Sequence, residues 1–129
     1  MTTFNIQSGW RVLILEDMPE RVAWFKERVP GAVYVTTAQS AIEALASQTF
    51  QVVFLDHDLH WMHAADNAII EGTGKEVALQ LAKMQFQGIV VIHSKNEDAV
   101  RVMLKSLPTA KVARFGEFEI IGLDEEPTT

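Results

Sequence analysis

The chain has 129 residues, a length typical of one domain, and its composition of 48% hydrophobic and 22% charged residues favours an ordinary globular core. A net charge of -6 gives no broad basic surface, so we expect no binding to duplex DNA, and the absence of cysteine excludes disulfides and thiolate metal sites. The N-terminal stretch is polar and no apolar run approaches the roughly 20 residues that span a bilayer, so we expect a cytoplasmic protein with no membrane partner.

The first half of the chain predicts three strands separated by two helices. The strands are apolar runs that end at polar or acidic residues, at 10–15, 32–35 and 51–55. The first helix follows Asp17, which can cap it, and ends before Pro30. The second helix begins after Thr36 or Thr37, either of which can serve as its cap. The hydrophobic period thus alternates between that of a buried strand and that of an amphipathic helix.

The second half begins with a polar, histidine-bearing stretch at 57–72, which is longer than the usual connection between such elements. Beyond it the pattern predicts a helix, a strand, a helix, a strand and a strand-like edge extension, at 73–84, 89–92, 94–107, 110–115 and 118–121. Thr73 is the expected cap of the first of these helices, and Ser94 or Asn96 of the second. We expect the acidic tail from Asp124 to be frayed.

Strict alternation of strands and helices predicts an α/β domain with a five-stranded parallel sheet between helices, a three-layer sandwich. We expect one domain over 1–129, with an ordered core at about 10–121. Only 14 residues follow Phe115, and EFEIIGL alternates like a strand, so a fifth helix is missing or replaced by a strand-like extension. Part of one sheet face would then be uncovered, which favours a homodimer or a protein partner at that face.

Acidic residues follow two of the predicted strands at the point where each strand ends. Glu16 and Asp17 follow the first strand, and Asp56 and Asp58 follow the third. In an open parallel sheet, ligands bind outside the carboxyl ends of the strands where the strand order reverses, so these acids should converge there. An oxygen-rich donor set suits a hydrated Mg²⁺ or Mn²⁺. The alternative is that each acid is only a solvated turn or cap residue.

Histidines on the long polar stretch offer a second kind of metal site. His57 lies between two carboxylates, and His60 and His63 follow closely. Imidazoles beside acids can ligate Zn²⁺, but their spacing matches no tight zinc template, and loop histidines are often exposed to solvent. We therefore expect Mg²⁺ or Mn²⁺ in preference to Zn²⁺.

Four polar residues, His93, Ser94, Lys95 and Asn96, follow the fourth strand and precede a helix. The amino end of a helix attracts anions, and Ser94, Lys95 or Asn96 could add hydrogen bonds or charge to a phosphate. Asn96 could equally be only a helix cap. His93 could act as a general acid or base near neutral pH, or be a histidine packed beneath the loop.

The order of strands, the acid pair Glu16–Asp17 and Asp56 at the end of the third strand resemble the receiver domains of two-component systems, which have a flavodoxin-like fold. The resemblance implies that the three acids hold magnesium, that Asp56 accepts a phosphoryl group, and that Ser94 is the strand-four hydroxyl. It also implies a lysine after the fifth strand. No lysine stands there, and Lys111 and Arg114 are imperfect substitutes.

Three strings, LDHDL (55–59), GTG (72–74) and IHSKN (92–96), are more similar to a variant branch, the cyclic-phosphate processing receiver domains. This resemblance implies metal-dependent processing of cyclic phosphate ends of RNA or nucleotides, a phosphoesterase activity. The metal ligands it implies are Asp17, Asp56 and Asp58, with Glu16 in support. It implies that His93, Ser94 and Asn96 contact the phosphate of the substrate. His93 or His57 would then donate a proton to the oxygen that leaves the phosphate.

Three functions follow as hypotheses. The first is the metal-dependent phosphoesterase, whose partner is a phosphate-containing small molecule or an RNA end. The second is a response-regulator receiver phosphorylated on Asp56. The third is a non-catalytic, receiver-like module that binds a protein through the uncovered sheet face or the stretch at 57–72.

Overall fold

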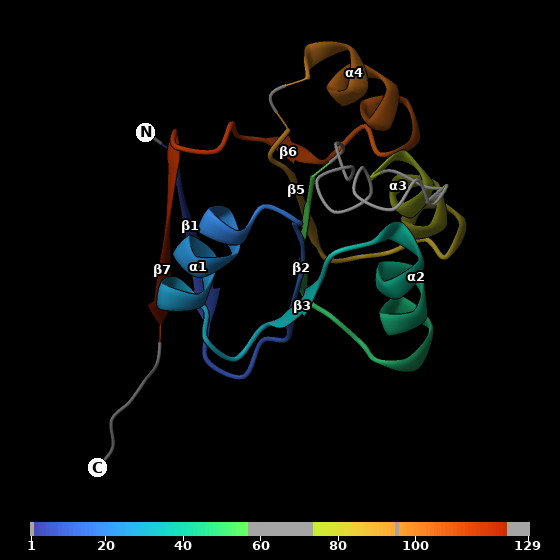
Figure 1. Ribbon diagram of the computed structural model, residues 1–129. Coiled ribbons are helices and arrows are strands. Elements are labelled where there is room, and N and C mark those ends of the chain that lie inside the picture. Colours follow the sequence, from blue (N-terminus) through green and yellow to red (C-terminus); the bar gives the residue numbers. More distant parts are fainter. Residues whose placement is uncertain (1, 57–73, 95, 124–129) are drawn as a thin grey trace, which may run out of the picture.

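Short strands and four helices of similar length make up the part of the chain that the computed structural model describes, residues 2–56, 74–94 and 96–123 (Figure 1). Five mostly apolar strands form the central sheet: β2 (Val12–Leu15), β3 (Val33–Val35), β4 (Val52–Leu55), β5 (Ile89–Ile92) and β6 (Lys111–Val112). The helices are α1 (Pro19–Arg28), α2 (Ala38–Ser47), α3 (Gly74–Lys83) and α4 (Glu97–Ser106). Among the described helices, none is long and apolar enough to cross a membrane.

The five central strands are parallel throughout and lie in the order β3-β2-β4-β5-β6. The chain therefore moves from β2 outward to β3, returns to β4 on the other side of β2, and continues outward, so the strand order reverses between β2 and β4. Leu15 at the end of β2 is paired with Leu55 at the end of β4. The predicted flavodoxin-like, five-stranded α/β fold is confirmed, and its switch point lies between the two strands that carry the acids.

Two apolar layers flank the central sheet because successive side chains on a strand point to opposite faces. On one face, Leu13, Leu15, Val53 and Leu55 pack against α2, α3 and α4. On the other face, Ile14 and Phe54 pack beneath α1 and two further strands. Figure 1 shows α2 and α3 to one side of the sheet and α1 with β1 and β7 to the other.

A second, two-stranded sheet joins the two ends of the described chain. The N-terminal segment forms β1 (Thr2–Gln7), which pairs in parallel with β7 (Phe118–Leu123). Side chains that alternate along the two strands point inward and are buried: Phe4, Ile6, Phe118 and Ile120. The core therefore begins well before residue 10, where the sequence predicted it to begin. The segment at 118–121 is not an edge extension of the last strand, since it pairs with β1 instead.

The β1–β7 sheet covers the sheet face that was expected to be open, so that expectation is wrong. The ring centroids of Phe4 and Phe118 lie 5.9 and 6.1 Å from that of Phe54 on β4. Phe25 of α1 is completely buried in the same cluster, 5.4 Å from Phe54. The two strands thus occupy the layer beside α1 that was expected to be uncovered because a fifth helix is missing. The prediction of a homodimer or a protein partner at this face therefore loses its basis, because the face is covered.

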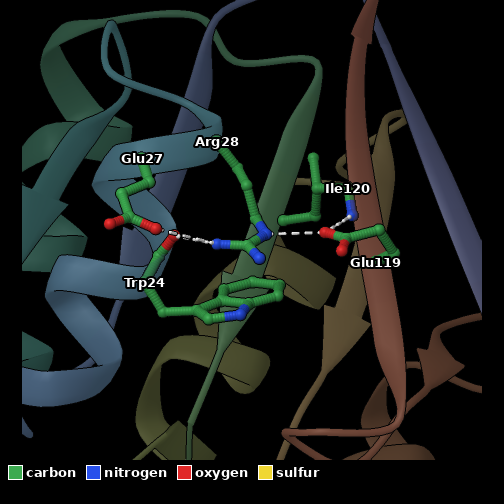
Figure 2. A network of polar contacts seen from close by, with 5 residues as sticks. All are labelled: Trp24, Glu27, Arg28, Glu119 and Ile120. Carbon is green, nitrogen blue, oxygen red and sulfur yellow. Dashed lines mark hydrogen bonds and ion pairs between the residues drawn. The ribbon is translucent and has the colours of Figure 1, made fainter.

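A network centred on Arg28 fastens α1 to β7, as Figure 2 shows. The Arg28 Nε donates to Glu119 Oε1 at 2.6 Å, and Nη1 donates to the carbonyl oxygen of Trp24 at 3.0 Å. The guanidinium also lies over the Trp24 ring, 3.9 Å from its centroid. Hydrogen bonding to Arg28 lowers the pKa of Glu119, so this carboxylate is ionised at neutral pH. The network therefore joins α1, which packs on the central sheet, to β7 of the two-stranded sheet.

Candidate metal and phosphate site

Three acids converge at the carboxyl ends of β2 and β4. Glu16 and Asp17 directly follow β2, and Asp56 directly follows β4. The backbone N–H of Asp56 donates to the carbonyl oxygen of Leu15 at 3.2 Å, which holds the two strand ends side by side. All three acids are buried, and one carboxylate oxygen from each lies within 4.8 Å of the others. The structure thus brings together three of the four acids proposed from the sequence as metal ligands.

Burial makes this cluster electrostatically unfavourable on its own. Glu16 is 1% exposed, and burial, reinforced by the negative charge of Asp56, raises its pKa to about 8. Its Oε2 accepts from the N–H of Met18 at 3.1 Å, whereas its Oε1 has no hydrogen-bond partner among the described residues. A proton or a cation is needed to neutralise carboxylates held this close. A set of carboxylate oxygens is the donor chemistry that Mg²⁺ prefers, so the three residues fit this ion.

His93 lies behind the acids and has no exposed surface. Its Nδ1 is 3.5 Å from Glu16 Oε1, and its ring packs against the rings of Phe25 and Phe54, with centroids 5.4 and 6.4 Å away. Burial, followed by the positive charge of Arg21, lowers the pKa of His93 to about 3. The imidazole is therefore neutral at pH 7, which does not fit the alternative of a general acid or base with a pKa near neutrality. Of the two interpretations of His93, the packed histidine fits its surroundings.

Ser94 and Asn96 form the turn that begins α4. The Asn96 side chain accepts from the N–H of Ala99 at 3.1 Å and is the N-cap of the helix, one of the two roles expected for it. The Ser94 hydroxyl oxygen accepts from the N–H of Asn96, also at 3.1 Å. Ser94 is nearly buried and directly follows His93, at the edge of the sheet where Asp56 ends the neighbouring strand. Its own O–H is not the donor in this hydrogen bond.

Arg21 belongs to the surroundings of the acids, and the sequence analysis missed it. Its Nη1 lies 3.9 Å from Glu16 Oε1, and its guanidinium carbon lies 4.8 Å from the ring centroid of Phe115. Arg21 is the third residue of α1. Positive charge is disfavoured near the amino end of a helix, so an arginine at this position beside an acid pair was a signal that could have been used.

The basic residues considered at the fifth strand, Lys111 and Arg114, are both exposed. Arg114 forms an ion pair with Glu97 of α4, and both side chains are largely exposed. Lys111 is exposed on the edge strand β6. Between them, Ala113 is the buried residue, and its N–H donates to the carbonyl oxygen of Ile92 at 3.0 Å. The buried residue that directly follows β6 is therefore an alanine and not a lysine.

Several residues proposed from the sequence lie outside the described residues. They are the proposed metal ligand Asp58, the possible proton donor His57, the phosphate-binding candidate Lys95, and the alternative zinc ligands His60 and His63. Their roles stay predictions. The acidic tail from Asp124 and the helix cap Thr73 lie outside the described part as well.

Comparison with known proteins links these residues to one family. The family model of the cyclic-phosphate processing receiver domain matches residues 11–109. The matched region contains the three buried acids, Arg21 and the turn from His93 to Asn96. No curated protein sequence matches the chain.

Solved structures with the same fold are receiver domains of distant sequence. A response-regulator receiver domain from Francisella has a TM-score of 0.63 and 15% identity, over 84% of this chain and 86% of that chain. TrrA, a response regulator from Thermotoga maritima in complex with Mg²⁺ and BeF, has a TM-score of 0.59 and 16% identity, over 89% and 87%. The receiver domain of a sensor histidine kinase from Pseudomonas aeruginosa, with magnesium coordinated in its active-site cleft, has a TM-score of 0.58 and 12% identity, over 92% and 88%.

Proposed function

Because this chain belongs to the family of cyclic-phosphate processing receiver domains, we propose that it processes cyclic phosphate ends of RNA or of nucleotides in a reaction that depends on a divalent cation. The observation that carries the proposal is the buried trio of Glu16, Asp17 and Asp56, whose oxygens lie within 4.8 Å of one another. Three carboxylates this close together suit a divalent cation, and a cation bound by them would attract a phosphate.

The three acids would hold Mg²⁺, with Mn²⁺ as an alternative ion and Zn²⁺ as a weaker one. The Mg²⁺ described for the Thermotoga and Pseudomonas receivers supports this choice of ion. When bound, the ion supplies charge neutralisation for phosphate oxygens and orients water. The fourth acid proposed from the sequence, Asp58, lies outside the described residues.

The residues after β5 would position the phosphate. Ser94 accepts a hydrogen bond from the N–H of Asn96, and its O–H can donate to a phosphate oxygen. The Asn96 side chain caps α4 and keeps the turn in place. His93 lies against Glu16, where it can hold that carboxylate in position. Its burial favours His57, which lies outside the described residues, as the group that protonates the departing oxygen.

The test is turnover of nucleoside 2′,3′-cyclic phosphates, and of RNA that ends in a cyclic phosphate, with Mg²⁺, Mn²⁺ or Zn²⁺. We expect Mg²⁺-dependent ring opening by the wild type and a loss of at least about a hundredfold in Asp56→Asn, because removing a group that acts with the metal removes a transition-state interaction. Asp98→Asn is the matched control, since Asp98 is an exposed acid on α4 that pairs with Arg101. No turnover with any of the three ions would refute the proposal.

Phosphorylation of Asp56 is the second candidate function. It is favoured by the position of Asp56 at the end of β4, beside two further acids and next to the strand that Ser94 follows. Incubation with acetyl phosphate and Mg²⁺ should then add the mass of one phosphoryl group to the wild type and none to Asp56→Asn. If the protein neither opens cyclic phosphates nor accepts a phosphoryl group, a non-catalytic, receiver-like interaction module becomes the better account.

A further inference from the structure

We propose that Arg21 binds the phosphate group of the substrate through its guanidinium, at the edge of the buried acid trio. This inference rests on the proposed function, because it assigns the residue that recognises the anion at the same site. It adds a residue from α1 to the acids from the strand ends and to the turn before α4.

The distance between Arg21 and the acids leaves the guanidinium able to bind another group. Arg21 Nη1 is 3.9 Å from Glu16 Oε1. The two groups form an ion pair, but this distance is too long for a hydrogen bond. A guanidinium carries five N–H donors in a planar fork, which matches the geometry of two oxygens of one phosphate. Arg21 can therefore remain beside Glu16 while it donates to a phosphate that approaches the cation.

Phe115 also contacts the guanidinium of Arg21. The Arg21 guanidinium carbon lies 4.8 Å from the centroid of this ring, a cation–π contact. The Phe115 ring is held in turn by Trp24, with centroids 5.1 Å apart. Stacking on a fixed ring limits the rotation of the guanidinium and leaves the N–H groups at its edge to reach a ligand. The side chain is 17% exposed, so solvent can still reach it.

The charge of Arg21 acts on the acidic site from α1. Its Nη1 lies 3.9 Å from Glu16 Oε1, the same oxygen that His93 Nδ1 approaches at 3.5 Å, so a positive charge stands beside this carboxylate. The basic side chain of Arg114 at the end of β6 is instead paired with Glu97. A phosphate that approaches three carboxylates and one divalent ion needs more positive charge than the ion provides, and Arg21 supplies it.

The test measures binding of inorganic phosphate to the full chain saturated with Mg²⁺, by isothermal titration calorimetry, and separately the affinity for Mg²⁺ itself. Arg21→Gln should weaken phosphate binding by about tenfold or more, the usual effect of losing a charge-assisted hydrogen bond. The same variant should bind Mg²⁺ as tightly as the wild type or more tightly, because it removes a positive charge beside the acids. Arg101→Gln, on the exposed face of α4, is the matched control and should change neither affinity.

Weaker phosphate binding without weaker Mg²⁺ binding separates phosphate recognition from a merely structural role, which would weaken both. Arg21→Lys keeps the charge but not the fork, and we expect it to bind phosphate about threefold more weakly than the wild type or worse. This variant decides the question if Arg21→Gln does not fold, since unchanged phosphate binding by Arg21→Lys would overturn the inference.

The outcome also distinguishes this inference from the proposed function. Equal phosphate binding by Arg21→Gln and the wild type refutes the role of Arg21 and leaves the cyclic-phosphate activity standing. Arg21-dependent phosphate binding without turnover of cyclic phosphates supports the role of Arg21 and refutes the activity. A wild type that does not bind phosphate in the presence of Mg²⁺ refutes the role of Arg21, whereas turnover of cyclic phosphates decides the activity.

Discussion

Burial shifts the pKa values of Glu16 and His93 in opposite directions. The pKa of Glu16 rises from 4.5 to about 8, while that of His93 falls from 6.5 to about 3. The contribution of Glu16 to stability is complete below pH 4.5 and is lost as the pH rises through 8. The contribution of His93 is complete above pH 6.5 and is lost as the pH falls towards 3. Between pH 4.5 and 6.5, a rise in pH lowers stability through Glu16 and raises it through His93. From pH 6.5 to 8 only the loss through Glu16 remains.

We therefore predict that the metal-free protein loses stability between pH 6.5 and 8. The free energy of unfolding should fall by at most about 1.4 kcal/mol per pH unit, the value for one proton held by the folded state and not by the unfolded state. Urea unfolding in the presence of a chelator measures it. The Glu16→Gln variant should show no such fall, because glutamine does not titrate. A decline of the same size in that variant would contradict the assignment to Glu16.

The cap made by Asn96 leads to a second prediction. Asn96→Ala removes the acceptor for the N–H of Ala99 and should reduce the free energy of unfolding by about 1 kcal/mol. Asn96→Ser should restore most of the loss, because a serine hydroxyl caps a helix nearly as well. Thermal or urea unfolding of the three proteins is the measurement. An equal loss in both variants would show that the amide has a task other than capping.

Residues at strand ends were predictable from the sequence, whereas residues that depend on packing were not. Glu16, Asp17 and Asp56 follow apolar runs directly, and parallel strands place such residues at one edge. The burial of His93 follows from its place two residues after Val91, on the face that packs against α1, but a loop position was also open to it. Arg21 lies beside both Glu16 and Phe115, and its contact with Phe115 spans 94 residues of sequence.

At the scale of elements, the β1–β7 sheet supplies part of the core on one face of the central sheet. Its inward side chains complete the aromatic cluster around Phe54, which also contains Phe25 of α1. The ring of Phe4 lies edge-on to that of Phe54 at 5.9 Å, and its side chain is 9% exposed. The N-terminal stretch, described from the sequence only as polar, therefore contributes Phe4 and Ile6 to the core.

We predict that Phe4→Ala destabilises the protein by about 3 kcal/mol, the usual loss for removing a buried phenylalanine ring. Asn5→Ala on the same strand is the matched control, because Asn5 is exposed and such substitutions change stability by less than about 0.5 kcal/mol. Urea unfolding of both variants provides the comparison. If the two variants were equally stable, β1 would contribute little to the fold in solution.

The elements of the central sheet were predictable because their apolar runs are continuous. The strand expected at 89–92 has the bounds of β5, and Thr37 was correctly named as a possible cap of α2, where its side chain accepts from the N–H of Ser40. Asp17 is not the cap of α1, because Met18 holds that position without a side-chain hydrogen bond. The strand β1 was missed since only two of its six side chains are buried and its partner lies at the far end of the chain.

At the scale of the whole molecule, the two faces of the central sheet are covered in different ways. Three helices cover one face, while one helix and a two-stranded sheet cover the other (Figure 1). The sequence predicted that a fifth helix is missing or replaced by a strand-like extension, but what fills its place depends on the pairing of β1 with β7. The acids lie at the switch point between β2 and β4, so their position follows from the strand order and does not depend on the kind of cover.

Binding of Mg²⁺ is the measurement that tests the central claim most directly, because every proposed function of the acid trio requires a cation there. Isothermal titration calorimetry at pH 8 should show one Mg²⁺ site in the wild type and in Asp98→Asn. In Asp56→Asn the affinity should fall by about tenfold or more, since the variant loses a charged oxygen ligand. Equal affinities in Asp56→Asn and the wild type, or no binding of Mg²⁺ by the wild type at millimolar concentrations, would contradict the claim that Glu16, Asp17 and Asp56 form a metal site.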